Sequence, residues 1–195
     1  RYLFYLEGAG STITINEGEF SFSSTLNQKR AYIYAGAGTT AYVKGGTFGK
    51  ASTRSGYTAG ILGEGTVIIT GGTFGFDPSA WVAPGYKVVK NGDKYYVVAE
   101  NVSAVASTQD EINAAVAAGG TVVVAAGEYT FPGSSIKEGT TLDCEEGTVF
   151  KGQSSLNIKG ATVEGATFDN PGGTVVGGTI NGTFKDCKFT GGNAL

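Results

Sequence analysis

The chain has 195 residues, a formal net charge of −3, 33 glycines, and neither methionine nor histidine. Fourteen basic residues against seventeen acidic ones do not supply the basic stripe of a nucleic-acid-binding domain, and no apolar run is long enough to cross a membrane. Glycine is far above its usual share of about 7%, but no Gly-X-Y period is present, which excludes collagen.

Three copies of one stretch organise the first half of the chain. In each copy, alternating strand residues lead to a glycine, then to Thr or Glu, and then to Phe20, Phe48 or Phe74. A fixed period of this size indicates stacked structural units, and the alternation indicates strands rather than helices. The copies occupy residues 12–20, 41–48 and 66–74.

Each copy follows an opening strand and a short glycine link, and the distance from that link to the phenylalanine is nine or ten residues every time. A constant register of this kind predicts parallel strands in successive layers, which describes a β-helix. We therefore expect Phe20, Phe48 and Phe74 to form an internal ladder. The predicted opening strands are 2–6, 31–34 and 58–62.

After Phe74 the repeat stops. Residues 76–86 contain two prolines and Trp81, and Asn91-Gly92 then joins two strands, which is the strongest short-range hairpin signal. A stack of strands needs its open end covered, so 76–99 is expected to be a cap. Trp81 fits either a lid over the last layer or a platform for a sugar.

The second half is predicted to begin with a link, Glu100–Ala106, and a short helix. Ser107 with Asp110 and Thr108 with Glu111 give two overlapping capping boxes. Short strands separated by glycines follow, so the expected domains are 1–100 and 101–195. The predicted strands are 121–125, 140–144, 148–150, 156–158, 161–163, 166–168, 174–176, 178–180, 182–184 and 187–189.

Cys144 and Cys187 are the two cysteines of the chain. They fit two buried small apolar residues, or a disulfide if their Cα atoms come within about 7 Å. Without histidine they do not suggest a zinc site. A translated chain begins with methionine, so this sequence, which begins at Arg1, is expected to be a fragment or a processed piece.

Two resemblances follow from these motifs. Gly-Gly-Thr-Phe at 71–74, with 77–86 and the hairpin, resembles a repeat of bacterial surface proteins and phage structural proteins. Residues 107–131 are similar to the opening of pectate-lyase-like β-helix domains, a family that includes polysaccharide lyases, hydrolases and phage tailspikes. The resemblances imply an all-β, right-handed parallel β-helix in two stacked segments, with a hairpin cap near 86–98 and a capping helix near 108–118.

The residues that such enzymes use are not evident. Pectate lyases rely on Ca²⁺-binding carboxylates and a basic residue, but no arginine follows Arg54, and the hydrolases rely on a histidine that this chain lacks. We assign no catalytic, cofactor-binding or metal-binding residue. Carboxylates that could still form a catalytic pair, or simply face solvent, are Asp143, Glu145, Glu146, Glu164, Asp169 and Asp186.

Tyrosines recur at equivalent positions of the first half, as Tyr2 and Tyr5 show in its first strand. Such residues pack on neighbouring strands, form oligomer interfaces or stack on sugars. We regard Tyr32, Tyr34, Tyr42 and Trp81 as candidates for a glycan or interface contact.

Repetition without recognisable chemistry favours a non-enzymatic structural protein of a phage virion, such as a fibre, head-decoration or tailspike-like part at the virion surface. The resemblance implies a homo-oligomer, with a trimer favoured, whose expected partners are other virion or cell-surface proteins and host surface glycan. No cofactor, nucleic acid or membrane is expected as a partner. The alternatives are a bacterial cell-surface adhesin and a polysaccharide lyase or glycoside hydrolase.

Overall fold

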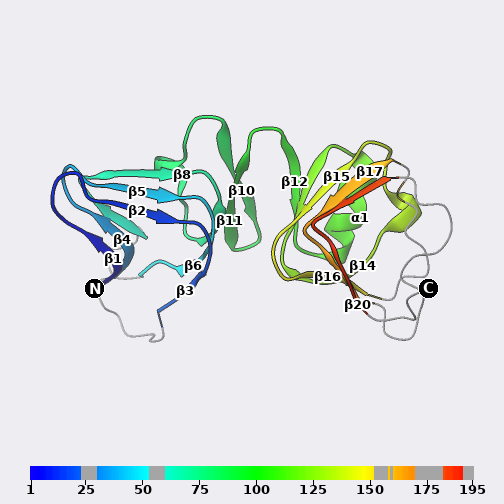
Figure 1. Cartoon of the computed structure of the whole chain (residues 1–195), viewed down its shortest axis with the longest axis horizontal. Helices are drawn as coiled ribbons and strands as arrows, with labels where there is room; N and C mark the ends of the chain where they lie inside the picture. Colours follow the sequence, from blue (N-terminus) through cyan, green and yellow to red (C-terminus); the bar gives the residue numbers. More distant parts are fainter. Residues whose placement is uncertain (23–29, 53–59, 152–157, 159, 170–181, 191–195) are drawn as a thin grey trace. The chain divides into compact units, whose positions relative to one another are not determined.

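The computed structural model describes residues 1–22, 30–52, 60–151, 158, 160–169 and 182–190. The chain divides into two compact units, unit 1 (Arg1–Glu100) and unit 2 (Asn101–Leu195). Strands dominate both, most of them paired in parallel, and the described residues contain one α-helix (Figure 1). The predicted all-β class is confirmed at this level.

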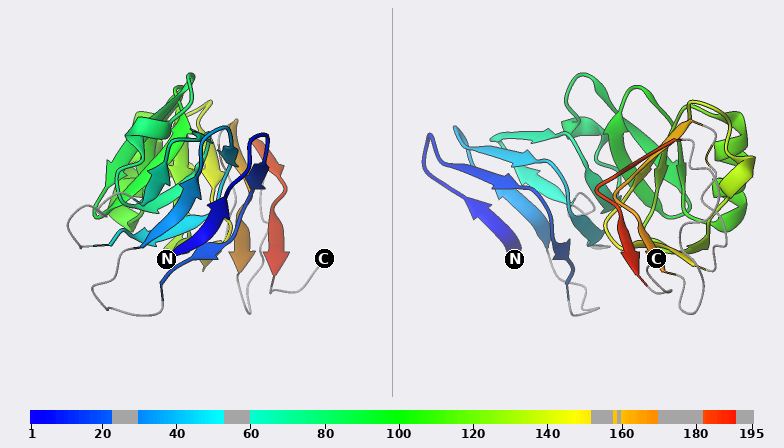
Figure 2. Two further views of the ribbon diagram at one scale, coloured as in Figure 1. Left: turned by 90° about the vertical axis from the view of Figure 1, so that its left-hand side faces the viewer. Right: turned by 45° about the vertical axis from the view of Figure 1, so that its right-hand side comes forward.

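Unit 1 is built from three layers, a layer being the three strands that one copy of the repeat supplies. Each strand pairs in parallel with its equivalent in the next layer, giving the sheets β1-β4-β7, β2-β5-β8 and β3-β6-β9. In both views of Figure 2 the blue and cyan strands of these layers run side by side. The strands are β1 (Tyr2–Leu6), β2 (Thr12–Ile15), β3 (Glu19–Phe20), β4 (Ala31–Ala35), β5 (Thr40–Val43), β6 (Thr47–Lys50), β7 (Ile61–Gly63), β8 (Thr66–Ile69) and β9 (Gly72–Gly75).

The Gly-Gly-Thr-Phe motif lies between two strands of a layer, and each of its two positions requires glycine for a different reason. A Cβ on Gly71 would lie against the backbone carbonyl of Lys44 in the layer before, so no larger residue fits without displacing a strand. Gly72 has φ 109° and Gly46 has φ 97°, backbone conformations that glycine adopts at little cost. The motif therefore turns the chain at a place where two layers approach each other closely.

Phe20, Phe48 and Phe74 lie opposite one another in the register of β3, β6 and β9. Their ring centroids are 4.8 Å apart from Phe20 to Phe48 and 5.0 Å apart from Phe48 to Phe74. Phe48 and Phe74 are fully buried in the core of unit 1, whereas Phe20 in the first layer is half-buried. The column of rings fills the space between the sheets.

The last layer of unit 1 is covered by 76–99. The hairpin of β10 (Tyr86–Asn91) and β11 (Lys94–Ala99) turns at Gly92, and β11 pairs with β9 in the antiparallel direction. Trp81, in the short 3-10 helix η1 (Ser79–Trp81), packs against the core, and Val82 bridges to Ile69 of β8. The predicted hairpin is confirmed, and Trp81 occupies the position expected of a lid.

Unit 2 contains two described sheets of parallel strands, ordered β12-β13-β15-β17-β19 and β14-β16-β18-β20. Leu142, Phe150, Val163 and Phe168 form its buried core with residues of the helix. The strands are β12 (Val102–Ala106), β13 (Thr121–Val124), β14 (Gly127–Thr130), β15 (Thr141–Cys144), β16 (Thr148–Lys151), β17 (Ala161–Glu164), β18 (Thr167–Asp169), β19 (Gly182–Lys185) and β20 (Lys188–Thr190). A second 3-10 helix, η2 (Gly133–Ser135), follows β14.

The helix α1 (Gln109–Ala118) covers the first strands of unit 2. Thr108 is its N-cap and forms a complete capping box with Glu111, so the second of the two predicted boxes is the one that forms. Ile112 and Val116 are fully buried against the core, and the Gly119 backbone ends the helix with φ 88°. The Lys137 ammonium and amide bond the carbonyls of Ala118 and Val116.

One predicted element is wrong. Glu100–Ala106 was expected to be a link, but most of it is β12, which pairs in parallel with β13 and buries Val105 and Ala106. The stretch has few turn residues after Asn101, and its partner strand makes it a strand. The predicted strands 174–176 and 178–180, and parts of 58–62 and 156–158, lie outside the described residues.

We predict that Gly71→Ala lowers the free energy of unfolding of unit 1 by about 2–3 kcal/mol, because the methyl group meets the Lys44 carbonyl. Gly10→Ala is the control: Gly10 has φ 85° but open space around it, so backbone strain alone costs about 1 kcal/mol. Urea unfolding followed by hydrogen exchange of unit 1 amides measures both. Equal losses would contradict the steric explanation.

We also predict that Phe48→Ala costs about 3–5 kcal/mol, since it empties the centre of the ring column. Tyr42→Ala, which removes an exposed ring from the same layer, should cost less than about 1 kcal/mol. The same urea experiment compares them. A Phe48→Ala protein as stable as Tyr42→Ala would show that the column does not support the core.

Candidate functional site

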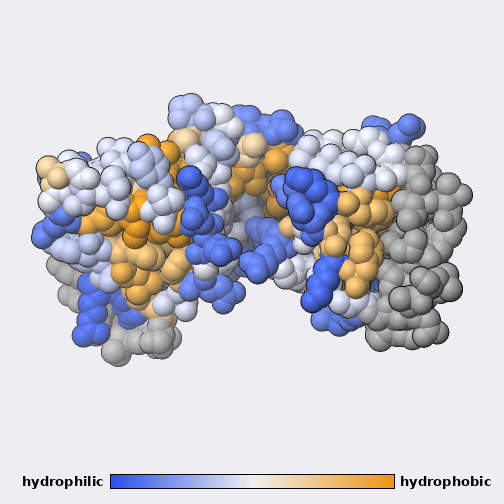
Figure 3. All heavy atoms as spheres, in the orientation of Figure 1, coloured by the Kyte–Doolittle hydropathy of each residue, from blue (hydrophilic) through white to orange (hydrophobic). Residues whose placement is uncertain are grey.

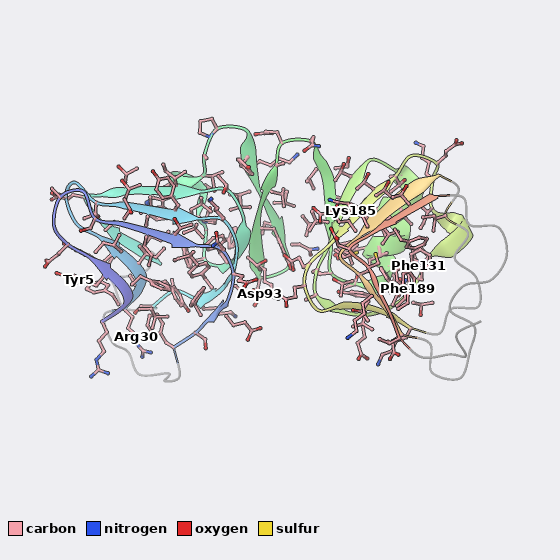
Figure 4. The ribbon with its side chains drawn as sticks, viewed as in Figure 1. Tyr5, Arg30, Asp93, Phe131, Lys185 and Phe189 are labelled. Atoms are coloured by element: carbon pink, nitrogen blue, oxygen red, sulfur yellow. The ribbon has the colours of Figure 1, made fainter. Side chains whose placement is uncertain are left out.

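An exposed cluster of tyrosines lies on the sheet β1-β4-β7. The register places Tyr5 opposite Tyr34, and Tyr34 opposite Leu62. The ring centroid of Tyr5 is 4.9 Å from that of Tyr34 and 5.5 Å from that of Tyr2, and Tyr2 lies 5.0 Å from Tyr34. We call these three residues the tyrosine cluster; Figure 4 labels Tyr5 on the outer side of unit 1.

The three distances show on which side of the Tyr5 ring the other two tyrosines lie. If Tyr2 and Tyr34 lay on opposite faces of Tyr5, their centroids would be separated by nearly the sum of the other two distances. They are 5.0 Å apart, so both lie toward the same side of Tyr5. The opposite face of the Tyr5 ring is not covered by the cluster, and the residue is 54% exposed, next to Leu3 at 44%.

Glu7 holds the hydroxyl end of this ring. The Tyr5 hydroxyl donates a hydrogen bond to Glu7 Oε1, which together with partial desolvation raises the pKa of Tyr5 to about 12. The Glu7 backbone is itself fixed, because Ser11 Oγ donates to the Glu7 carbonyl at 2.9 Å and the Ser11 amide closes a turn with Gly8. The carboxylate and the ring are therefore positioned together at the surface.

Tyr32 does not belong to this surface, and its predicted contact role is wrong. It is 1% exposed and packs against Phe22, Phe48 and Phe76. The amides of Tyr32 and Ile33 both donate to the carbonyl of Gly60, at 2.7 and 3.4 Å. Tyr32 and Tyr34 lie two residues apart in β4, but the Tyr32 ring is in the core whereas the Tyr34 ring belongs to the tyrosine cluster.

The remaining predicted contact residues are dispersed. Tyr34 is in the tyrosine cluster, whereas Tyr42, 37% exposed, lies on another sheet between Thr14 and Ile68. Trp81 is half-buried against the core at the hairpin end of unit 1. The structure therefore does not bring Tyr34, Tyr42 and Trp81 into one site.

Leu3 and Glu7 were not anticipated from the sequence. Alternation within β1 places Leu3 and Tyr5 on one face, a signal that was available. Glu7 is two residues beyond Tyr5, so the same alternation, continued past the end of β1, places it beside that ring. Tyr2 and Tyr5 belong to the recurrent tyrosines of the first half of the chain.

A second arrangement of polar side chains lies on the outer face of unit 2. Asp143, Glu164 and Lys185 occupy the same register position of β15, β17 and β19. Neighbouring strands are about 4.8 Å apart, so the two carboxylates lie side by side. The Lys185 ammonium forms an ion pair with Glu164 Oε1.

Glu164 and Lys185 have opposite effects on the pKa of Asp143. Partial desolvation on the sheet and the Glu164 carboxylate raise the pKa of Asp143, while the Lys185 charge lowers it. A carboxyl group of raised pKa next to an ionised one is the arrangement of an acid and a base in glycoside hydrolysis. Here Asp143 is exposed and Glu164 is already paired, so an ordinary surface ion-pair column explains the same contacts.

The other candidate carboxylates serve local contacts or solvent. Glu145 accepts a hydrogen bond from the Ala126 amide at 3.3 Å, and Asp169 accepts one from Thr190 Oγ1 at 2.9 Å. Glu146 is exposed, and Asp186 occupies the turn between β19 and β20 with φ 52°. Within the described ranges no three His, Cys, Asp or Glu residues are grouped as a metal site would need.

Cys144 and Cys187 are free thiols in the core of unit 2. Cys144 ends β15 and Cys187 precedes β20, next to the end of β19, and β17 pairs between β15 and β19. Two strand spacings of about 4.8 Å exceed the reach of a disulfide of about 7 Å. Burial raises the pKa of both thiols, which leaves them protonated and unreactive.

Apolar surface is visible where β1, β2 and β3 are the outermost strands of their sheets, and again beside β20 (Figure 3). Phe4 of β1, Ile13 of β2 and Phe20 of β3 are half-buried, and Phe189 of β20 is 42% exposed. No helix in the described part of the chain has the length and apolar character needed to cross a membrane.

Comparisons of the chain with protein-family models, with curated proteins and with solved structures find no match.

We predict that Glu164→Gln lowers the pKa of Asp143, because it removes the neighbouring negative charge and releases Lys185 from its ion pair. Lys185→Gln should raise it. Carbon-detected NMR titration of the Asp143 carboxyl group measures both shifts, and shifts of the same sign would contradict the described column.

The sign for stability follows from the raised pKa. Folding favours the protonated form of Asp143, because its pKa is higher in the folded protein than in the unfolded chain. The stability that this preference contributes is present at pH values below the pKa of the unfolded chain. It is lost as the pH rises through the pKa of the folded protein. At neutral pH, Asp143→Asn should therefore stabilise unit 2 slightly, and exposure of the side chain keeps the gain small.

Proposed function

We propose that the chain is a non-enzymatic structural protein of a virion surface, a fibre, head-decoration or tailspike-like part built from two right-handed parallel β-helix segments. The observation that carries the proposal is the pairing of equivalent strands in successive layers of both units. A protein that repeats one packing pattern in this way provides a passive scaffold with long outer faces for contact.

The register supports the helical winding of each unit. Thr12, Thr40 and Thr66 are in register at intervals of 28 and 26 residues, and all three sheets of unit 1 share the same layer order. In unit 2, Thr121, Thr141, Thr162 and Thr183 follow at intervals of 20, 21 and 21 residues. Regular intervals and parallel pairing in a constant layer order are what a β-helix would require, so they support this part of the proposal.

The outer faces support a contact role. The tyrosine cluster, Leu3 and Phe189 expose aromatic and apolar side chains on different elements. Such groups bind partner subunits and sugars. On this proposal the chain forms a homotrimer, contacts other virion proteins, and meets host surface glycan through the tyrosine cluster. An adhesin at a bacterial surface would use the same faces.

Multi-angle light scattering of the purified chain at tens of micromolar tests the assembly. We expect the mass of a trimer, because apolar side chains are exposed on the surface and the tailspike-like proteins that the chain resembles commonly form trimers. A monomer over this range would contradict the assembly. Neighbouring genes then distinguish the two surfaces: virion structural genes support the proposal, and bacterial secretion or cell-wall genes support the adhesin.

A polysaccharide lyase or hydrolase is the second candidate, favoured by the pairing of Asp143 with Glu164. Incubation with acidic and neutral polysaccharides, followed by assay of unsaturated or reducing ends, tests it. Release of such ends that Asp143→Asn abolishes, and Asp186→Asn does not, would replace the structural proposal with the enzyme.

A further inference from the structure

We propose that Tyr5 and Glu7 form a binding site for neutral glycans, in which the open face of the Tyr5 ring stacks on a pyranose and the Glu7 carboxylate accepts hydrogen bonds from sugar hydroxyls. The inference rests on the proposed glycan contact and specifies its position and the class of sugar.

The ring is suited to stacking because the residue is largely exposed and its aromatic neighbours lie toward one side of it. Tyr2 and Tyr34 lie toward the same side of Tyr5, and the residue is 54% exposed on the outer side of β1 (Figure 4). A pyranose presents a flat face of C–H groups, which packs on an aromatic face of similar size. Leu3, also exposed on β1, extends the apolar surface.

The ring is also held in place before a ligand arrives. Two aromatic neighbours support it from behind, and its hydroxyl is bonded to Glu7, which the Ser11 contact fixes in turn. A side chain that is already ordered loses little conformational freedom on binding. Tyr42 lacks this support: no aromatic ring packs against it among the described residues.

Glu7 determines the charge of the ligand. An ionised carboxylate accepts several hydrogen bonds, and Tyr5 uses one of them. A second carboxylate brought to the same place, as in a uronic acid, would be repelled. Arg1, at the other end of β1, is separated from Glu7 by roughly 20 Å of extended chain. This exceeds the Debye length of about 8 Å at physiological salt, so its charge is largely screened at Glu7.

Isothermal titration calorimetry of the full chain tests the site. The probes are neutral oligosaccharides of glucose, mannose, galactose and N-acetylglucosamine, and oligogalacturonate as the acidic counterpart. We expect at least one neutral oligosaccharide to bind at millimolar concentration or better, and oligogalacturonate at least tenfold more weakly. Tyr5→Ala should weaken the neutral ligand at least tenfold, and Tyr42→Ala, the matched exposed tyrosine, less than twofold.

Glu7→Gln separates stacking from charge. It keeps the ring and should reduce the difference between neutral and acidic ligands by severalfold. Thermal unfolding of Tyr5→Ala is the control for folding, and Tyr5→Phe, which keeps the stacking face, should retain more affinity than Tyr5→Ala. Perturbation of the Tyr5 ring resonances by the bound sugar would locate the contact directly.

Three outcomes would overturn the site: no neutral probe binds, Tyr5→Ala binds as well as the unmodified chain, or oligogalacturonate binds more tightly than every neutral probe. Light scattering of the same samples is recorded alongside. If Tyr5→Ala dissociates an oligomer, the cluster is an interface between copies and the glycan site is rejected, while the structural role stands. A monomeric chain that still binds neutral sugar contradicts the assembly alone.

Discussion

Parallel hydrogen bonding between equivalent residues of successive layers is the constraint on which the rest of the structure depends. Because the pairing is in register, whatever occupies one position in a layer lies against its counterpart in the next. The column of Phe20, Phe48 and Phe74 is one result, and the charged column of unit 2 is another. The glycines are required by the same constraint, since Gly71 lies against a backbone carbonyl of the preceding layer.

The same register distributes side chains between structural and contact roles. Positions that face inward supply apolar rings, whereas positions that face outward accept almost any residue that tolerates its neighbours in the column. The outer face of unit 1 carries aromatic groups, and that of unit 2 carries carboxylates and lysines. A contact surface can therefore change without altering the core beneath it. On this view the glycan contact that we propose for Tyr5 and Glu7 would require no change in the core of unit 1.

The sequence predicted the features that depend on residues close together in the chain or on a regular repeat. Asn91-Gly92 predicted the hairpin, and Thr108 with Glu111 predicted the start of the helix. The regular spacing of the phenylalanines predicted the layers. The burial of Tyr32 depends on contacts with Phe22, Phe48 and Phe76 from other segments, and the position of Tyr32 in the repeat does not reveal these contacts.

Features that depend on the alignment of distant strands were less accessible. The neighbourhood of Asp143 and Glu164 requires knowing which of several carboxylates share a register, and the strand β12 is recognisable only once β13 is known to pair with it.

The direction of the strand pairing also determines how each unit would resist a pulling force. Successive strands in a unit are joined by hydrogen bonds that run from layer to layer. Tension applied from layer to layer would load these bonds one strand at a time and peel the unit stepwise, whereas tension along a strand would load a whole row at once, so resistance to pulling depends on the direction of attachment.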